Sequence, residues 1–115
     1  MTMPVTEAIT RYASAAEAYG RAIKNGQATE SDKHFDAVEE AFAKLKAHGN
    51  NGLRAIAELL ESKDDGVKLW SAAHLLNYPE FGSLEVLERL KRSRSILALT
   101  AEVTLDQWRN GKLTY

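Results

Sequence analysis

Three histidines are the side chains in this sequence best suited to bind a metal ion or to act as a general base. They are His34, His48 and His74, and none has a second ligand at the spacing of a His-Glu-x-x-His or Glu-x-x-His motif. The sequence therefore predicts no metal site and no catalytic histidine. On a helix His74 would share a face with Lys68 and Ser71, and we expect a partly exposed or core histidine with one hydrogen bond.

Glu102, Asp106 and Arg109 would lie on one face of a helix, because successive members are four and three residues apart. Paired carboxylates can catalyse acid–base reactions when burial separates their pKa values. This stripe is, however, the polar one of its helix, which predicts that it faces solvent, and no nucleophile or second base accompanies it. We therefore rank an enzyme that uses Glu102 and Asp106 behind the non-catalytic hypotheses.

A dense basic cluster comprises Arg89, Lys91, Arg92 and Arg94. Such a cluster could contact the phosphates of a nucleic acid. Cations also stabilise the C-terminal end of a helix without any ligand, and no aromatic side chain is interleaved to stack on bases. Nucleic-acid contact through this cluster is therefore the alternative functional hypothesis.

Other catalytic and cofactor motifs are missing from the sequence. The seven glycines form neither Gly-x-Gly-x-x-Gly nor a phosphate-binding loop, and no serine lies in a Gly-x-Ser-x-Gly context. There is no cysteine for a disulfide, a thiolate nucleophile or a thiolate metal ligand. We therefore predict no catalytic residue, no cofactor and no bound metal.

The aromatic residues divide into two groups. Trp70 and Trp108 stand at helical spacing among leucines and alanines, which predicts core packing. Tyr78 and Phe81 fall in a predicted loop, where no helical period requires their burial, and are better placed to contact a partner. The predicted partner-binding surface consists of Lys68, Ser71, His74, Tyr78 and Phe81.

Length and composition are those of one globular domain. The chain has 115 residues, of which 44% are hydrophobic and 27% charged, and a formal net charge of -1. That charge provides no long-range attraction to nucleic acid or to an anionic membrane surface. The sequence contains no run of about eighteen apolar residues and no basic start followed by an apolar run, so we expect a cytoplasmic protein that does not span a membrane.

Apolar residues recur at three- and four-residue steps through most of the chain, and no strand-like alternation occurs. This periodicity predicts an all-α fold of about six helices, the first two forming an antiparallel hairpin. Thr6, Ser31 and Ser83 are the predicted N-caps. We expect the helices at about 7–25, 31–48, 52–61, 67–76, 83–92 and 95–109.

The same spacing predicts which side chains face the core. We expect Phe35 to face inward from the second helix, Leu84 from the fifth, and Ile96, Leu99 and Val103 from the sixth. The tail after residue 111 could fold back onto the helices.

The segment 67–76 is apolar on most of its circumference when placed on a helix, so it is predicted to lie inside the domain with the other helices packed about it. It also has a counterpart twenty-nine positions later, which indicates a repeated helix–turn–helix unit. The matched pairs are Val67 with Ile96, Ser71 with Thr100, Ala72 with Ala101 and Leu76 with Leu105.

The run from Asp64 to Leu76, in which an acidic turn leads into Val67, Lys68 and an alanine pair, resembles the second half of a short HEAT-type repeat. From about residue 49 to 113 the chain is also similar to an uncharacterised bacterial domain family with HEAT-like helical repeats. The resemblance implies a HEAT-like α–α superhelix within one domain of 1–115, with a hairpin at 6–48 and two helix pairs at 49–113. It implies no functional residue, although some similar small proteins are immunity partners of bacterial toxins.

We expect a non-catalytic protein-binding module of a bacterial cytoplasm. The expectation rests on the lack of chemical motifs and on the partner-binding surfaces that stacked helical repeats present. The predicted partner is another protein, with nucleic acid as the alternative and no membrane partner.

Overall fold

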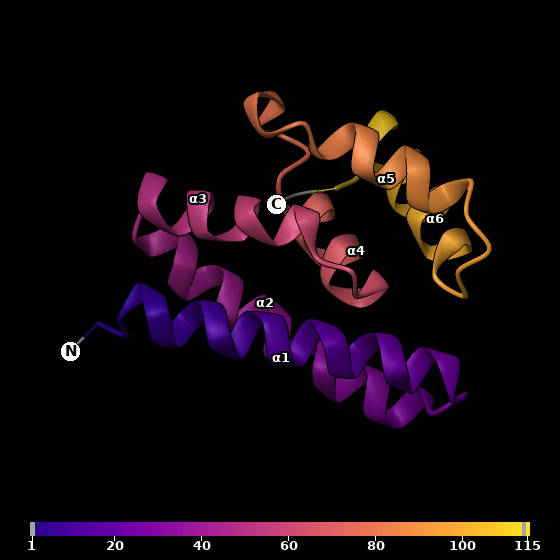
Figure 1. Cartoon of the computed structure of the whole chain (residues 1–115), viewed down its shortest axis with the longest axis horizontal. Coiled ribbons are helices and arrows are strands. Elements are labelled where there is room, and N and C mark those ends of the chain that lie inside the picture. The colour runs from indigo at the N-terminus through magenta and orange to yellow at the C-terminus, as the bar shows by residue number, and fades with distance from the viewer. Residues whose placement is uncertain (1, 114) are drawn as a thin grey trace.

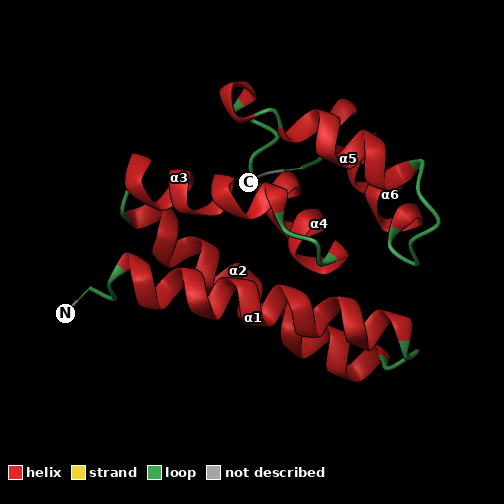
Figure 2. Ribbon diagram, viewed as in Figure 1, coloured by secondary structure: helices red, strands yellow, loops and turns green. Residues whose placement is uncertain are grey.

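The computed structural model describes residues 2–113 and 115, and these residues form helices and loops but no strand (Figure 1, Figure 2). The all-α class and the six α-helices predicted from the apolar periodicity are confirmed. Two single-turn 3-10 helices, η1 and η2, accompany them. The elements are α1 (Val5–Lys24), α2 (Ala28–Ala47), α3 (Asn50–Glu58), η1 (Leu59–Glu61), α4 (Asp65–His74), η2 (Pro79–Phe81), α5 (Ser83–Lys91) and α6 (Ala98–Arg109).

The helices are arranged around α4. Helices α1 and α2 form an antiparallel hairpin, α4 packs on α1 and on α5, and α6 packs on α5 (Figure 1). The chain then returns, so that its last residue lies beside α4 near the middle of the view. The predicted hairpin and the predicted central position of the apolar helix are thus both present.

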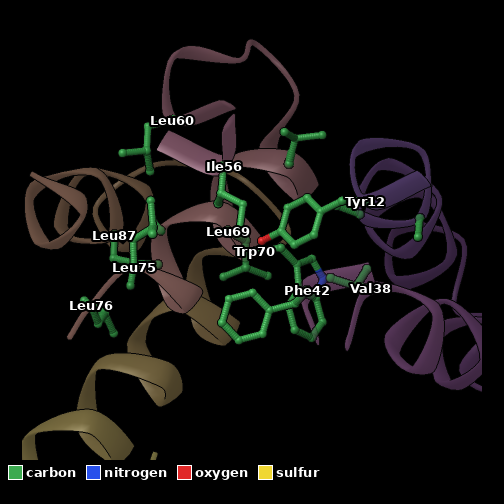
Figure 3. Packing of buried hydrophobic residues seen from close by; sticks show 14 of the residues in the cluster. Tyr12, Val38, Phe42, Ile56, Leu60, Leu69, Trp70, Leu75, Leu76 and Leu87 are labelled. Carbon is green, nitrogen blue, oxygen red and sulfur yellow. The ribbon is translucent and has the colours of Figure 1, made fainter. Parts of the chain in front are cut away.

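Burial explains the central position of α4. Eight of its ten residues are buried, including Trp70 and His74. Tyr12 from α1 and Phe42 from α2 converge on the same core, whereas Leu87 packs into it from α5 (Figure 3). Burial of Trp70 confirms the core position that its spacing predicts.

Small residues allow α1 and α4 to approach closely. A Cβ on Gly66 of α4 would lie 2.4 Å from the main-chain oxygen of Ala16, and a Cβ on Gly20 would lie 3.2 Å from the Cα of Gly66. Side chains larger than hydrogen at Gly66 therefore collide with the backbone of α1. This crossing fixes the position of the N-terminal half of α4 against the hairpin.

The three predicted N-caps are wrong. Helix α1 already begins at Val5, with Pro4 in the N-cap position, so Thr6 lies inside the helix. Helix α2 begins at Ala28, and the Ser31 hydroxyl donates back to the main-chain oxygen of that residue. A hydroxyl within hydrogen-bonding reach of its own helix can make this bond in place of a cap.

Ser83 is likewise the first residue of α5 rather than its cap, and its N-cap position is held by Gly82 with a φ of 73°. The cap that the structure does form belongs to α4. The Asp64 carboxylate accepts from the Val67 N–H at 3.0 Å, as a residue in the N-cap position commonly does.

The predicted inward face of α6 is wrong. Ile96 is 60% exposed, Leu99 68% and Val103 46%, whereas Leu97 and Leu105 are buried. Both sets of residues have helical spacing, so the sequence alone offers two apolar stripes for one helix.

Serine side chains accompany the late start of α6. The Ser93 hydroxyl accepts from the N–H of Ser95, and the Ser95 hydroxyl accepts from the N–H of Leu97. These bonds hold the segment in turns and delay the helix to Ala98, three residues later than predicted.

Phe35 and Leu84 were also expected in the core, and both are exposed, by 42% and 40%. Phe35 still contacts Trp70 with its ring, at the edge of the core. On α5 the buried positions are Leu87 and Leu90 instead. The described residues include no helix that is long and apolar enough to cross a membrane.

Candidate functional site

The three histidines lie in three separate environments. His74 is fully buried, so it is a core histidine and not part of an exposed stripe. The His48 ring bonds through Nε2 to the main-chain oxygen of Met3. His34 is half-buried on α2. Within the described range no three His, Cys, Asp or Glu side chains gather in a way that could hold a metal ion.

His74 makes two hydrogen bonds through its two ring nitrogens. Its Nε2 lies 2.8 Å from Oε1 of Glu39, and its Nδ1 lies 2.6 Å from the hydroxyl of Tyr12. A carboxylate can only accept, so Nε2 carries the hydrogen and Nδ1 of the neutral ring accepts from the tyrosine. Helices α1, α2 and α4 are thereby joined by one chain of polar groups, from the buried Tyr12 and His74 to the partly exposed Glu39.

Aromatic rings enclose this polar chain. The Phe42 ring stacks on the His74 imidazole with centroids 3.8 Å apart and planes 5° apart. Tyr115 contacts the imidazole edge-on at 4.4 Å, and its main-chain oxygen accepts from Asn77. The C-terminal residue is therefore attached to the core, which confirms that the tail folds back.

Burial determines the ionisation of these groups. It lowers the pKa of His74, although the hydrogen bond that the imidazole donates to Glu39 opposes this shift, and it raises the pKa of Tyr12, with the Glu39 charge adding to the effect. His74 is therefore held neutral and Tyr12 protonated.

The order hydroxyl, imidazole, carboxylate is that of a catalytic triad, but its position in the molecule does not suit catalysis. The Tyr12 side chain is 0% exposed, so a substrate cannot reach its hydroxyl. A nucleophile is activated by a lowered pKa or an adjacent base with access to substrate. We interpret the Tyr12, His74 and Glu39 chain as a structural network of the core.

The predicted partner-binding surface is not assembled. Ser71 and His74 are both 0% exposed, and the Ser71 hydroxyl donates to the main-chain oxygen of Val67. The prediction of an exposed stripe is therefore wrong for these two residues, because α4 packs on helices along both of its sides. Lys68 is half-buried near Asp65. Tyr78 and Phe81 are partly buried against the core.

Two of the four members of the basic cluster lie beside carboxylates of α5. Arg89 bonds Glu85 at 2.7 Å, and Arg92 lies 3.7 Å from Glu88. Hydrogen bonding to Arg89 and Arg109 also lowers the pKa values of Glu85 and Glu88, respectively, so both stay ionised. Of the remaining members, Lys91 is half-buried and Arg94 exposed. These carboxylates reduce the positive field that phosphates would meet.

Glu102 and Asp106 are exposed on α6, as their position on the polar stripe predicts. Arg109 does not join them, since its guanidinium bonds Glu88 of α5. The pair therefore lies in solvent without an enclosing pocket.

A groove that sequence reasoning did not identify lies between the hairpin, α4 and α6. Its volume is about 180 Å³, and its lining includes Tyr19, Phe35, Trp70, Val103 and Tyr115 but no charged side chain. The Trp70 ring stands nearly perpendicular to those of Tyr19 and Phe35, at centroid distances of 5.3 Å and 5.2 Å. Aromatic rings thus form adjoining walls of the groove.

Exposed apolar side chains continue from this groove along α6. Phe35 and Val103 line it and are 42% and 46% exposed, and Leu99 lies one turn before Val103. Ile96 lies in the turn that precedes α6 and is 60% exposed. We call Phe35, Ile96, Leu99 and Val103 the apolar strip. The sequence signal for the strip was the second apolar stripe of α6, which the helical period alone assigns to the core.

A larger hollow of about 590 Å³ lies at the other end of the strip, where Lys24, Asp65, Arg94 and Ile96 contribute to its lining. Its charges are of both signs, and the N-terminus of α4 there is already capped by Asp64. The hollow therefore presents neither a field of one sign nor a free helix N-terminus to a ligand.

Comparison of the chain with protein-family models, curated proteins and solved structures gives no match.

Proposed function

We propose that the protein is a non-catalytic protein-binding module that holds an apolar segment of a partner polypeptide along the apolar strip and in the adjoining groove. The observation that carries the proposal is the exposure of four large apolar side chains at and near the groove: Phe35 and Val103 in its lining, Leu99 one turn before Val103, and Ile96 just before α6. Large apolar side chains that collect at a concave surface are typical of interaction sites.

The surrounding structure supports a pre-formed site. Trp70 forms a wall of the groove and is itself 5% exposed, so the core holds that wall in place. The Tyr115 ring, another wall, is fastened by contacts with His74 and Phe42. A rigid site loses little conformational entropy when a partner binds.

The proposed interface lies on α2, on α6 and in the turn before α6, in place of the surface predicted at Lys68, Ser71, His74, Tyr78 and Phe81. The wider setting is proposed from the resemblance: a HEAT-like helical protein of a bacterial cytoplasm, with an immunity role towards a toxin as one form of partner binding. The resemblance covers about residues 49 to 113, which include α6 and its exposed face.

A display selection tests the proposal directly. Random peptides are selected on the immobilised protein, and the affinity of an enriched peptide is measured by fluorescence polarisation for the wild type and for Leu99→Asp. We expect the aspartate variant to bind at least about tenfold more weakly, because a carboxylate would have to be desolvated in the interface.

Leu84→Asp is the matched control, since Leu84 is another exposed leucine, 40% accessible, on α5 outside the strip. It should leave peptide affinity unchanged. Failure to enrich any peptide, or equal affinity of the Leu99→Asp variant, would overturn the proposed function.

A further inference from the structure

Four aromatic side chains meet at the groove described above. Tyr19 comes from α1, Phe35 from α2, Trp70 from α4, and Tyr115 from the tail. Rings that stand at 72° and 82° to Trp70 form a corner rather than a flat stack. Such a corner presents π-electron density from more than one direction to an occupant.

The charges near these rings are negative. Burial raises the pKa of Tyr19, and the negative charge of Asp32 raises it further. Burial and the negative charge of Glu39 raise the pKa of Tyr115 in the same way. The lining itself contains no Lys or Arg. The one cation on a neighbouring ring, Lys46, lies 5.8 Å above Phe42, which is not part of the lining.

An occupant with a delocalised positive charge fits these surroundings. Ring faces attract a cation within about 6 Å of their centroids, and nearby carboxylates add to the attraction. His74, directly behind Trp70 and Tyr115, is held neutral by burial and does not compete. The flat guanidinium of arginine both stacks on aromatic faces and bonds carboxylates.

We propose that the groove is an aromatic cage for an arginine side chain of the partner segment, with Tyr19, Phe35, Trp70 and Tyr115 as its walls and Asp32 at its margin. This inference rests on the proposed function, and it names the residue that anchors the partner in the same site. The apolar strip then contacts the apolar side chains that flank the arginine.

Nuclear magnetic resonance titration with N-acetyl-arginine amide tests the cage without knowledge of the partner. The chain has two tryptophans, so the indole N–H signals of Trp70 and Trp108 serve as probe and internal control. Trp108 donates to Asn77 and does not line the cage. We expect a saturable shift of the Trp70 signal alone.

N-acetyl-citrulline amide is the matched ligand, because it keeps the shape of arginine and removes the charge. It should bind about fivefold more weakly or not at all. Equal binding of the two amides, no saturable shift with arginine, or tighter binding of tetramethylammonium than of the arginine amide would each overturn the proposal.

Asp32→Asn and Asp36→Asn provide a matched pair on α2. Both carboxylates are exposed, but of the two only the charge of Asp32 raises the pKa of Tyr19. We expect Asp32→Asn to weaken arginine-amide binding about twofold to fivefold and Asp36→Asn to leave it unchanged. Equal effects of the two variants would contradict the placement of the cage.

The selected peptides separate the two proposals. Peptides that lose affinity with Leu99→Asp but not on replacement of arginine by citrulline would retain the protein-binding function and overturn the cage. A specific shift of Trp70 with the arginine amide, in a protein that enriches no peptide, would retain the cage and overturn the function.

Discussion

Nε2 of His74 lies 2.8 Å from the Glu39 carboxylate, although the imidazole is 0% exposed and the glutamate side chain 33%. The bond therefore connects the inside of the core to its surface, through a ring that stacks on Phe42. A buried polar group of this kind stabilises a fold only while its partners remain in place.

Stability should fall when the solution is acidified below about pH 6.5. The pKa of His74 is lowered in the folded protein from an ordinary value of 6.5, because burial disfavours the imidazolium ion. The unfolded chain therefore binds more protons in the window between the lowered pKa and 6.5, and unfolding becomes easier as pH falls through it. Above pH 6.5 the stability associated with the neutral His74 is fully retained.

Urea unfolding of the wild type and of His74→Gln at several pH values tests whether stability falls on acidification because of His74. The difference between the two free energies of unfolding should shrink as pH falls from 7 to 5, since the variant has no group to protonate at this position. His34 and His48 are present in both proteins, so they do not contribute to the difference between the two free energies. A difference that stays constant or grows on acidification would contradict the assignment of a neutral His74.

Tyr12→Phe should destabilise the protein by about 1–3 kcal/mol, because the change leaves Nδ1 of His74 buried without a donor. The ring of Tyr12 is retained, so packing changes little. Urea unfolding at pH 7 measures the loss. Tyr78→Phe is the control, since Tyr78 is half-buried and away from this network, and it should cost less than about 0.5 kcal/mol.

Gly66→Ala should cost about 1–3 kcal/mol or more, because the new methyl group would lie 2.4 Å from the main-chain oxygen of Ala16. Backbone atoms of two packed helices cannot move apart locally, so α1 and α4 must separate. Gly20→Ala is the graded control, since its Cβ would approach Gly66 only to 3.2 Å. The thermal unfolding midpoint of Gly66→Ala should be lower than that of Gly20→Ala. The reverse order would refute the close crossing of α1 and α4.

The helices could be predicted from the sequence because apolar spacing is a local signal. About six were expected and the described residues form six, and the central helix was identified from the apolar circumference of 67–76. Boundaries were less certain where hydroxyl side chains could bond to nearby main-chain atoms. Ser31 and Ser95 both do so, and each accompanies a helix that starts about three residues from its predicted position.

The candidate site could not be predicted, because its residues are distant in the sequence. His74 meets Tyr12 across 62 positions and Glu39 across 35, so the periodicity around residue 74 contains no information about either partner. The groove likewise needs Tyr19, Phe35, Trp70 and Tyr115 together. Helical spacing indicates which residues of one helix share a face, and the packing of other helices decides which face is covered.

Two leucines of α6 allow the orientation of that helix to be tested with one substitution. Leu105→Ala should cost about 2–5 kcal/mol, since Leu105 is 0% exposed and its removal leaves a cavity against α5. Leu99→Ala should cost less than about 0.5 kcal/mol, since Leu99 is 68% exposed. Urea unfolding of both variants measures the contrast. Equal losses would place Leu99 in the core and so contradict its position in the apolar strip. The expected contrast would mean that a loss of peptide affinity in Leu99→Asp results from weaker binding and not from unfolding.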